Sequence, residues 1–533
     1  MSPAFRALCL SLALVITSGC ATPKKVEPVL FPPELSVAST SATLGVGHLG
    51  ILQNQMQTIL ARAPHPDLIS VSVREADSPL LAFEKDADLG RPPVSSQKIL
   101  TTVAALDTLG PTFRYKTDVI ASGRVDDKRK VLWGDLVIKG SGDPTFGGRY
   151  SPIPGNPAST FKHWAHDLRA VGVQRIDGSI LVDSSAFDDE MLHLDWPEKQ
   201  RAYGFMAPIS ALSFNENCVD LTLTAGWFRN SPAHIKLSPE SKFYRKTQNS
   251  DVRTGLNDNV TSLSLRRQAN GDLLLISGTI PTHSTLHERI TIGHPAEYFG
   301  TVLRETLEKQ KFPVGRPAVT SVKDAKNATK LTTGTKTILS YPSPPLLEIT
   351  GMALKHNDNF ITEMLFKSLS SKPATFNGAI DAVENFLAKR HINNWDPQIR
   401  DGSGLSRKNS LPANLITAVL QFAAQQNYGP AYENALATPG ENGVLEDWFT
   451  DLRHSKGGHN MIQRIHAIHG QYAGAYDLSG YATSSEGQRF VFSFMVNDPS
   501  LKPEQARQLL ERLTETLVRS KAVGKTPSGV IQK

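Results

Sequence analysis

The stretch that decides the fold is PPVSSQK, residues 92–98, which opens a helical pattern. Ser95 and Lys98 stand three residues apart in it, so a helix places both on one face. A serine hydroxyl becomes a nucleophile beside a base, and a lysine can be that base once burial lowers its pKa. The helix start also turns backbone N–H groups toward a developing oxyanion. The apolar residues of the pattern recur at three- and four-residue spacing: Ile99, Val103, Leu106 and Leu109.

The segments at the two ends of the chain predict one sheet. Residues 68–74 alternate in β fashion and 79–83 follow a short polar turn, which indicates a hairpin just before the S-x-x-K helix. Two further strands are expected at 476–483 and 489–496, before an amphipathic helix that begins at Pro503. We therefore predict an α+β fold with an antiparallel sheet covered by helices.

Short strands separated by Gly, Asp and Asn dominate the middle of the chain. We interpret 111–335 as inserted β-rich subdomains with helical stretches near 160–171 and 295–309. Residues 46–110 and 336–520 then form one discontinuous domain, and 521–533 a flexible tail. In the second part of this discontinuous domain, helices are expected at 346–369, 379–390 and 412–426.

The composition excludes several classes of protein. The 533 residues include 57 Lys+Arg and 51 Asp+Glu, and 40% are hydrophobic, so the chain is neither disordered nor strongly charged. It contains no run of five basic residues, which argues against a nucleic-acid partner. The three cysteines Cys9, Cys20 and Cys218 cannot make a disulfide scaffold, and we expect Cys218 to be a buried small hydrophobe.

The N-terminus has the pattern of a secretory signal. Arg6 precedes an apolar stretch at 8–16 that is too short to span a bilayer. Thr17-Ser18-Gly19-Cys20 resembles a bacterial lipobox, so we predict a signal peptide at 1–19, a lipid on Cys20 and a Pro/Ser-rich tether at 20–45. This predicts a periplasmic protein anchored in the outer membrane of a Gram-negative bacterium. The alternative is a plain signal peptide with an incidental cysteine.

Three further stretches accompany the S-x-x-K tetrad: KGSGDP at 139–144, APISALSFNEN at 207–217 and DGSGLSR at 401–407. Together they resemble the D-alanyl-D-alanine carboxypeptidase/endopeptidase family of serine peptidases, the class C low-molecular-mass penicillin-binding proteins. The resemblance extends from about residue 49 to about 515. It implies a β-lactamase/transpeptidase-like domain, split by an insertion after the S-x-x-K helix.

The resemblance assigns roles residue by residue. Ser95 matches the acylated nucleophile and Lys98 the base. Asn359 matches the Asn of the S-x-N motif, which contacts the substrate amide and the lysine. Asn357 stands where the family has Ser, and a carboxamide is a poor proton relay.

The third motif, K-T-G, is matched by Ile468-His469-Gly470. Gly470 is kept, Ile468 replaces the Lys and His469 the Thr that bind the peptide carboxylate. A protonated His469 would compensate in part, although strand geometry turns it to the opposite face from Ile468. The backbone N–H of Gln471 is the expected second oxyanion donor.

These matches support a serine-type D-Ala-D-Ala carboxypeptidase/endopeptidase that acts on peptidoglycan stem peptides through an acyl-enzyme. β-Lactam antibiotics are then expected to acylate the same serine. Two alternatives remain: a pseudo-enzyme of the same fold that binds cell-wall peptides or a protein partner, and a hydrolase with another substrate. No cofactor is implied. The histidines that cluster near the C-terminus show no metal-ligand spacing, so no metal site is expected: His454, His459, His466 and His469.

Overall fold

A five-stranded antiparallel sheet joins the two ends of the described chain, in the order β16-β17-β18-β1-β2. Its central pair places β1 (Ile69–Glu75) beside β18 (Arg489–Val496), with Ser72 opposite Ser493. The predicted assembly of one sheet from both chain ends is therefore confirmed. Alternating side chains give each strand two apolar faces, and both faces are covered by helices.

The computed structural model describes residues 47–246, 250–255, 261–268, 273–316, 319–321 and 335–521. The predicted signal peptide, the Cys20 anchor with its tether, and the tail beyond residue 521 lie outside the described residues. Within the described ranges, no helix combines the length and apolar character needed to cross a membrane.

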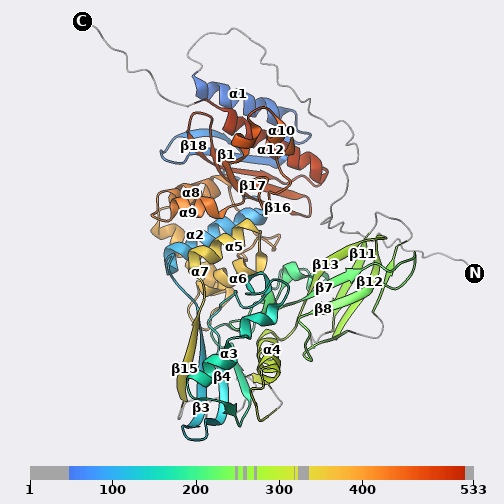
Figure 1. The fold of residues 1–533 in the computed structure, drawn as a ribbon. Helices are drawn as coiled ribbons and strands as arrows, with labels where there is room; N and C mark the ends of the chain where they lie inside the picture. Colours follow the sequence, from blue (N-terminus) through green and yellow to red (C-terminus); the bar gives the residue numbers. More distant parts are fainter. Residues whose placement is uncertain are drawn as a thin grey trace, which may run out of the picture.

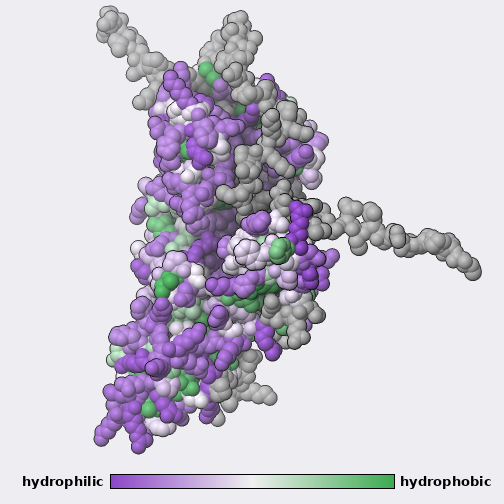
Figure 2. All heavy atoms as spheres, turned by 45° about the vertical axis from the view of Figure 1, so that its right-hand side comes forward, coloured by the Kyte–Doolittle hydropathy of each residue, from purple (hydrophilic) through white to green (hydrophobic). Residues whose placement is uncertain are grey.

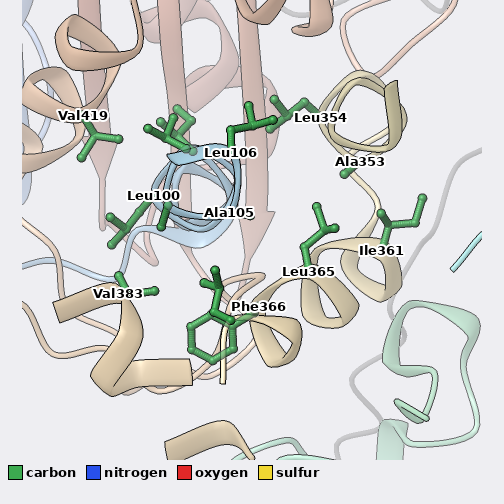
Figure 3. Close-up of a cluster of buried hydrophobic side chains, with 14 of the residues drawn as sticks. Leu100, Ala105, Leu106, Ala353, Leu354, Ile361, Leu365, Phe366, Val383 and Val419 are labelled. Atoms are coloured by element: carbon green, nitrogen blue, oxygen red, sulfur yellow. The ribbon is translucent and has the colours of Figure 1, made fainter. Parts of the chain in front are cut away.

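Two hydrophobic cores lie on opposite faces of this sheet. Helices α1 (His48–Ala61) and α12 (Pro503–Arg519) cover one face, and the helical lobe around α2 (Gln97–Leu109) covers the other (Figure 1). Figure 3 shows α2 surrounded by side chains of the lobe. Ten consecutive residues of α2, from 97 to 106, are buried, so the helix that carries Lys98 is a fixed central element.

The remaining helices are α3 (Trp164–Ala170), α4 (Pro295–Lys309), α5 (Leu346–Lys355), α6 (Asn359–Ser368), α7 (Phe376–Lys389), α8 (Ala413–Ala424), α9 (Gly429–Ala435), α10 (Thr450–His454) and α11 (Gly458–Ile462). The single helix expected over 346–369 is wrong, because the chain breaks between α5 and α6. Asn357 has a left-handed φ of 52°, and the Asp358 carboxylate caps α6 by accepting the Ile361 N–H at 2.9 Å. Periodicity does not detect such a break, since apolar residues continue at helical spacing across it, as Leu354, Ile361 and Leu365 do.

The insertion folds as β-rich layers with a core of its own. It contains a six-stranded sheet ordered β14-β6-β4-β3-β15, with β5 paired to β4, a four-stranded sheet of β9 to β12, and a three-stranded sheet ordered β13-β7-β8. Figure 1 shows the sheet with β3, β4 and β15 below the helical lobe, and the strands β7, β8, β11, β12 and β13 to its right. In the face drawn in Figure 2, hydrophobic residues are scattered among hydrophilic ones.

The other strands have these bounds: β2 (Leu81–Lys85), β3 (Lys116–Asp126), β4 (Val131–Lys139), β5 (Arg175–Ile176), β6 (Ile180–Asp183), β7 (Cys218–Thr224), β8 (His234–Ser238), β9 (Arg245–Lys246), β10 (Asp251–Thr254), β11 (Ser262–Arg267), β12 (Leu273–Ile280), β13 (Thr285–Thr291), β14 (Val319–Ser321), β15 (Thr335–Pro342), β16 (Ile465–Tyr472) and β17 (Ala475–Thr483).

Candidate active site

Ser95 lies in a short 3-10 turn, η2 (Val94–Ser96), that leads directly into α2. Its side chain is buried, with 4% of the residue exposed. Val94 has a φ of 44°, a region that β-branched residues rarely adopt. Gly404, in a loop that crosses this turn, contacts the Val94 backbone. A Cβ at Gly404 would lie 1.7 Å from the Val94 carbonyl oxygen. A strained turn is thus held in place by a close backbone packing.

Gly470 of β16 packs directly against Ser95. A Cβ at Gly470 would lie 2.4 Å from the Ser95 Oγ and 2.6 Å from its backbone nitrogen. Any side chain at this position would displace the serine. The glycine assigned to the third motif therefore lies beside the candidate nucleophile. The next residue of the strand, Gln471, is exposed.

Lys98 is fully enclosed one helical turn after Ser95. Its Nζ donates a hydrogen bond to the Ser403 carbonyl oxygen at 2.9 Å. Burial lowers the pKa of Lys98 to about 8, and nearby carboxyl groups, of which Asp477 is the strongest, offset part of that effect. An amine with such a pKa is neutral in a useful fraction of molecules near neutral pH, as a base requires.

The DGSG stretch at 401–404 forms the wall against which Lys98 rests. The Thr101 hydroxyl donates to the Gly402 carbonyl at 2.7 Å. The Glu363 carboxyl accepts the N–H groups of Gly402 and Ser403 at 3.1 and 2.7 Å. Burial raises the pKa of Glu363. Helices α2 and α6 thereby fix the carbonyl that orients the lysine.

The two asparagines of the second motif point to different neighbours. The Asn357 Nδ2 donates to the His469 carbonyl at 3.1 Å, which joins the α5–α6 break to β16. The Asn359 Nδ2 donates to the Phe205 carbonyl at 3.0 Å, in the insertion. The structure therefore places Asn357 at the strand that packs on the serine, and Asn359 at the contact with the insertion.

His469 does not supply a cation to this site. Its ring packs on the Trp448 indole with centroids 4.4 Å apart, on the side of the sheet opposite the buried Ile468. Burial, together with the nearby Arg507 charge, lowers the pKa of His469 to about 4. The ring is neutral at pH 7, so the suggested compensation for the missing Lys of the third motif is not supported.

An ion-pair cluster connects the insertion to the α5–α6 break. Arg149 lies 3.2 Å from the Asp358 carboxylate and 3.4 Å from Glu216. Glu216 also pairs with Arg289. Both carboxylates are almost fully buried, so each depends on these partners. The insertion thus braces the segment that carries Asn357.

Two buried acids beside Lys98 were not expected from the sequence: Glu363 and Asp477. A carboxyl in the middle of the otherwise uncharged strand β17 was the available signal for Asp477. Among the described residues, no group of three or more His, Cys, Asp or Glu is arranged to hold a metal ion. Cys218 is buried as expected, and burial raises the pKa of its thiol to about 12.

The chain is similar to known proteins in both sequence and fold. The model of the D-Ala-D-Ala carboxypeptidase 3 (S13) family matches residues 52–517. A D-alanyl-D-alanine carboxypeptidase from Actinomadura sp. (strain R39) is 27% identical over 424 residues, which cover 76% of this chain and 73% of that protein.

Two solved structures of penicillin binding protein 4 from Haemophilus influenzae share the fold. One has a TM-score of 0.71 at 19% identity and covers 86% of this chain and 100% of that one. The other, complexed with a β-lactam, has a TM-score of 0.69 at 18% identity and covers 87% and 99%. The family match extends over nearly all described residues, including the S-x-x-K turn and Gly470. The chain therefore belongs to the D-Ala-D-Ala carboxypeptidase 3 (S13) family, a family of serine-type DD-peptidases.

Proposed function

We propose that this protein removes the terminal D-alanine of peptidoglycan stem peptides, and cleaves equivalent cross-links, through an acyl-enzyme on Ser95. The observation that carries the proposal is the buried Lys98 one helical turn after the buried Ser95, with Gly470 packed on the serine. Family membership gives the substrate class, because the relative from Actinomadura is named for this activity.

In the proposed reaction, the Ser95 Oγ attacks the carbonyl carbon of the penultimate D-Ala while the Lys98 amine takes its proton. The backbone N–H groups of Ser95 and Gln471 stabilise the oxyanion. The intermediate then expels the leaving amine, which receives the proton from Lys98, and an ester remains on Ser95. Water hydrolyses the ester, again with Lys98 as base, and restores the serine.

The two departures from the family motifs shape this mechanism. Asn357 cannot relay a proton as a hydroxyl does, so Lys98 itself carries the proton to the leaving amine. Ile468 offers no charge to a peptide carboxylate, so substrate binding relies on the peptide backbone and on the acyl side of the bond.

The same proposal includes the place where the protein works. We infer that Cys20 is lipidated after removal of the signal peptide and holds the protein at the periplasmic face of a membrane, near its peptidoglycan substrate. The support is the Thr17-Ser18-Gly19-Cys20 pattern. Incorporation of radioactive palmitate that is lost in Cys20→Ser would support the anchor, and equal incorporation in both would contradict it.

Labelling with a fluorescent penicillin tests the catalytic part, since β-lactams acylate the serine that attacks the peptide. The native protein should be labelled and Ser95→Ala should not, while the matched control Ser185→Ala, an exposed serine of the insertion, should label as the native protein does. Tandem mass spectrometry should find the adduct on Ser95. Labelling that persists in Ser95→Ala, or a folded native protein that is neither labelled nor able to release D-alanine from a pentapeptide, would refute the proposal.

A further inference from the structure

Asp477 is a buried carboxyl one strand away from the candidate nucleophile. It lies in β17 directly opposite Gly470 of β16, and Gly470 packs on Ser95. The residue has no exposed surface. A carboxyl is costly to bury without specific partners, so its contacts indicate what it does.

One contact is with the turn that carries the serine. The Asp477 Oδ2 accepts a hydrogen bond from the backbone N–H of Ser96, the first amide after the nucleophile. The Ser96 hydroxyl also lies 2.6 Å from that of Ser479 on the same strand. Because Val94 at the start of this turn has a strained φ of 44°, the turn depends on such anchors to keep Ser95 in place.

The other relation is with the charge of Lys98. Burial raises the pKa of Asp477, and hydrogen bonds from Ser96 and Gly470 and then the Lys98 charge lower it. Asp477 is in turn the strongest of the carboxyls that raise the pKa of Lys98. Three more acids face Lys98 from other elements: Glu363 on α6, Asp401 in the DGSG loop and Asp358 before α6.

Burial raises the pKa of Asp477 to about 7, while it lowers that of Lys98 to about 8. The two groups therefore change charge in the same pH range and affect each other. Position 468 of β16, which faces the same lobe, carries Ile and adds no second cation.

We propose that Asp477 is a positioning residue of the Ser95–Lys98 pair with two separable roles. Its oxygen holds the nucleophile turn through the Ser96 amide. Its negative charge stabilises the Lys98 ammonium, and so sets the pH above which the amine accepts the serine proton. The second role rests on the proposed function of Lys98 as base.

Asp477→Asn and Asp477→Ala separate the roles, because both remove the charge and only Asn keeps an oxygen for the Ser96 amide. In Asp477→Asn, the rise of penicillin acylation with pH should move down by about 1 unit or more, as expected when an opposite charge leaves the neighbourhood of a base. In Asp477→Ala, the same shift should accompany a loss of rate on the order of 10²-fold at every pH, since the turn is released. The control Ser479→Ala removes a neutral contact with Ser96 and should leave the midpoint of the profile in place.

An NMR titration of Lys98 gives a readout independent of activity. Protein labelled with ¹³Cε-lysine, with Lys98→Met to assign the resonance, should show the Lys98 midpoint fall in both Asp477 variants. An unchanged midpoint would overturn the charge role, and equal acylation rates in Asn and Ala variants would overturn the positioning role. If the native protein is not acylated at all, the proposed function fails while this titration still decides the effect of Asp477 on Lys98.

Discussion

Replacing Gly470 by alanine tests the geometry at the centre of the site. The added Cβ would lie 2.4 Å from the Ser95 Oγ, 2.6 Å from its backbone nitrogen and 2.7 Å from its Cβ. Ordinary contact to carbon needs at least ~3.5 Å, so the turn and strand β16 must separate by about 1 Å. A displacement of about 1 Å at a reacting group costs on the order of 10²-fold in rate. Overpacking of this kind also costs ~1–3 kcal/mol of stability.

The measurements are the rate of acylation by a fluorescent penicillin and the free energy of unfolding in urea. Gly351→Ala, on helix α5, is the matched control. Its added Cβ would lie at an ordinary contact distance of 3.5 Å from the Ala435 Cβ. That variant should acylate at the native rate and unfold with equal or slightly higher stability, since alanine favours a helix over glycine by ~1 kcal/mol. A Gly470→Ala protein that acylates as fast as the native one would refute the placement of β16 against Ser95.

Three further predictions concern charge and proton transfer. Because burial lowers the pKa of Lys98 to about 8 and the neutral amine is the base, acylation should rise about tenfold per pH unit up to about pH 8 and then level off; a flat profile between pH 6 and 9 would contradict this role. The double variant Asn357→Ser/Ile468→Lys should raise the second-order acylation constant about tenfold or more, since a proton relay contributes ~10²–10⁴-fold; no gain would show that these positions are not the family's motif sites. Arg149→Ala should lower the free energy of unfolding by about 1–3 kcal/mol in a chemical melt, because the buried Asp358 loses a partner, and an unchanged melt would show that the pair is not stabilising.

On the proposed assignment, the departures at Asn357 and Ile468 change the charge of the site more than its shape. The family fold is intact, and the Ser95 turn, Gly470 and the DGSG loop keep close contact. Lys98 is surrounded by several buried acids, and position 468, which the resemblance assigns to a second lysine, carries Ile. The pKa of Lys98 is therefore set by burial, which lowers it, and by the carboxyl groups, which raise it, rather than by a neighbouring ammonium.

The sequence by itself determined the elements and most of the site's backbone. Hydrophobic periodicity predicted the α2 helix and the strands of the central sheet, because which face an element buries is fixed by local spacing. The S-x-x-K spacing predicted Lys98 one helical turn after Ser95 for the same reason. Gly470 was found by counting back along the sequence from the strand that follows it, because the two strands of a hairpin pair in a fixed register.

Only the tertiary structure decided which groups surround Lys98. Ser96 and Asp477 are 381 residues apart in sequence, and Asn357 and His469 are 112 apart. No periodic pattern connects such residues, because their contact depends on how the sheet and helical lobe pack. The direction of His469, its neutral state and the pKa of Lys98 follow from burial, which is a property of the packed molecule and not of the local sequence.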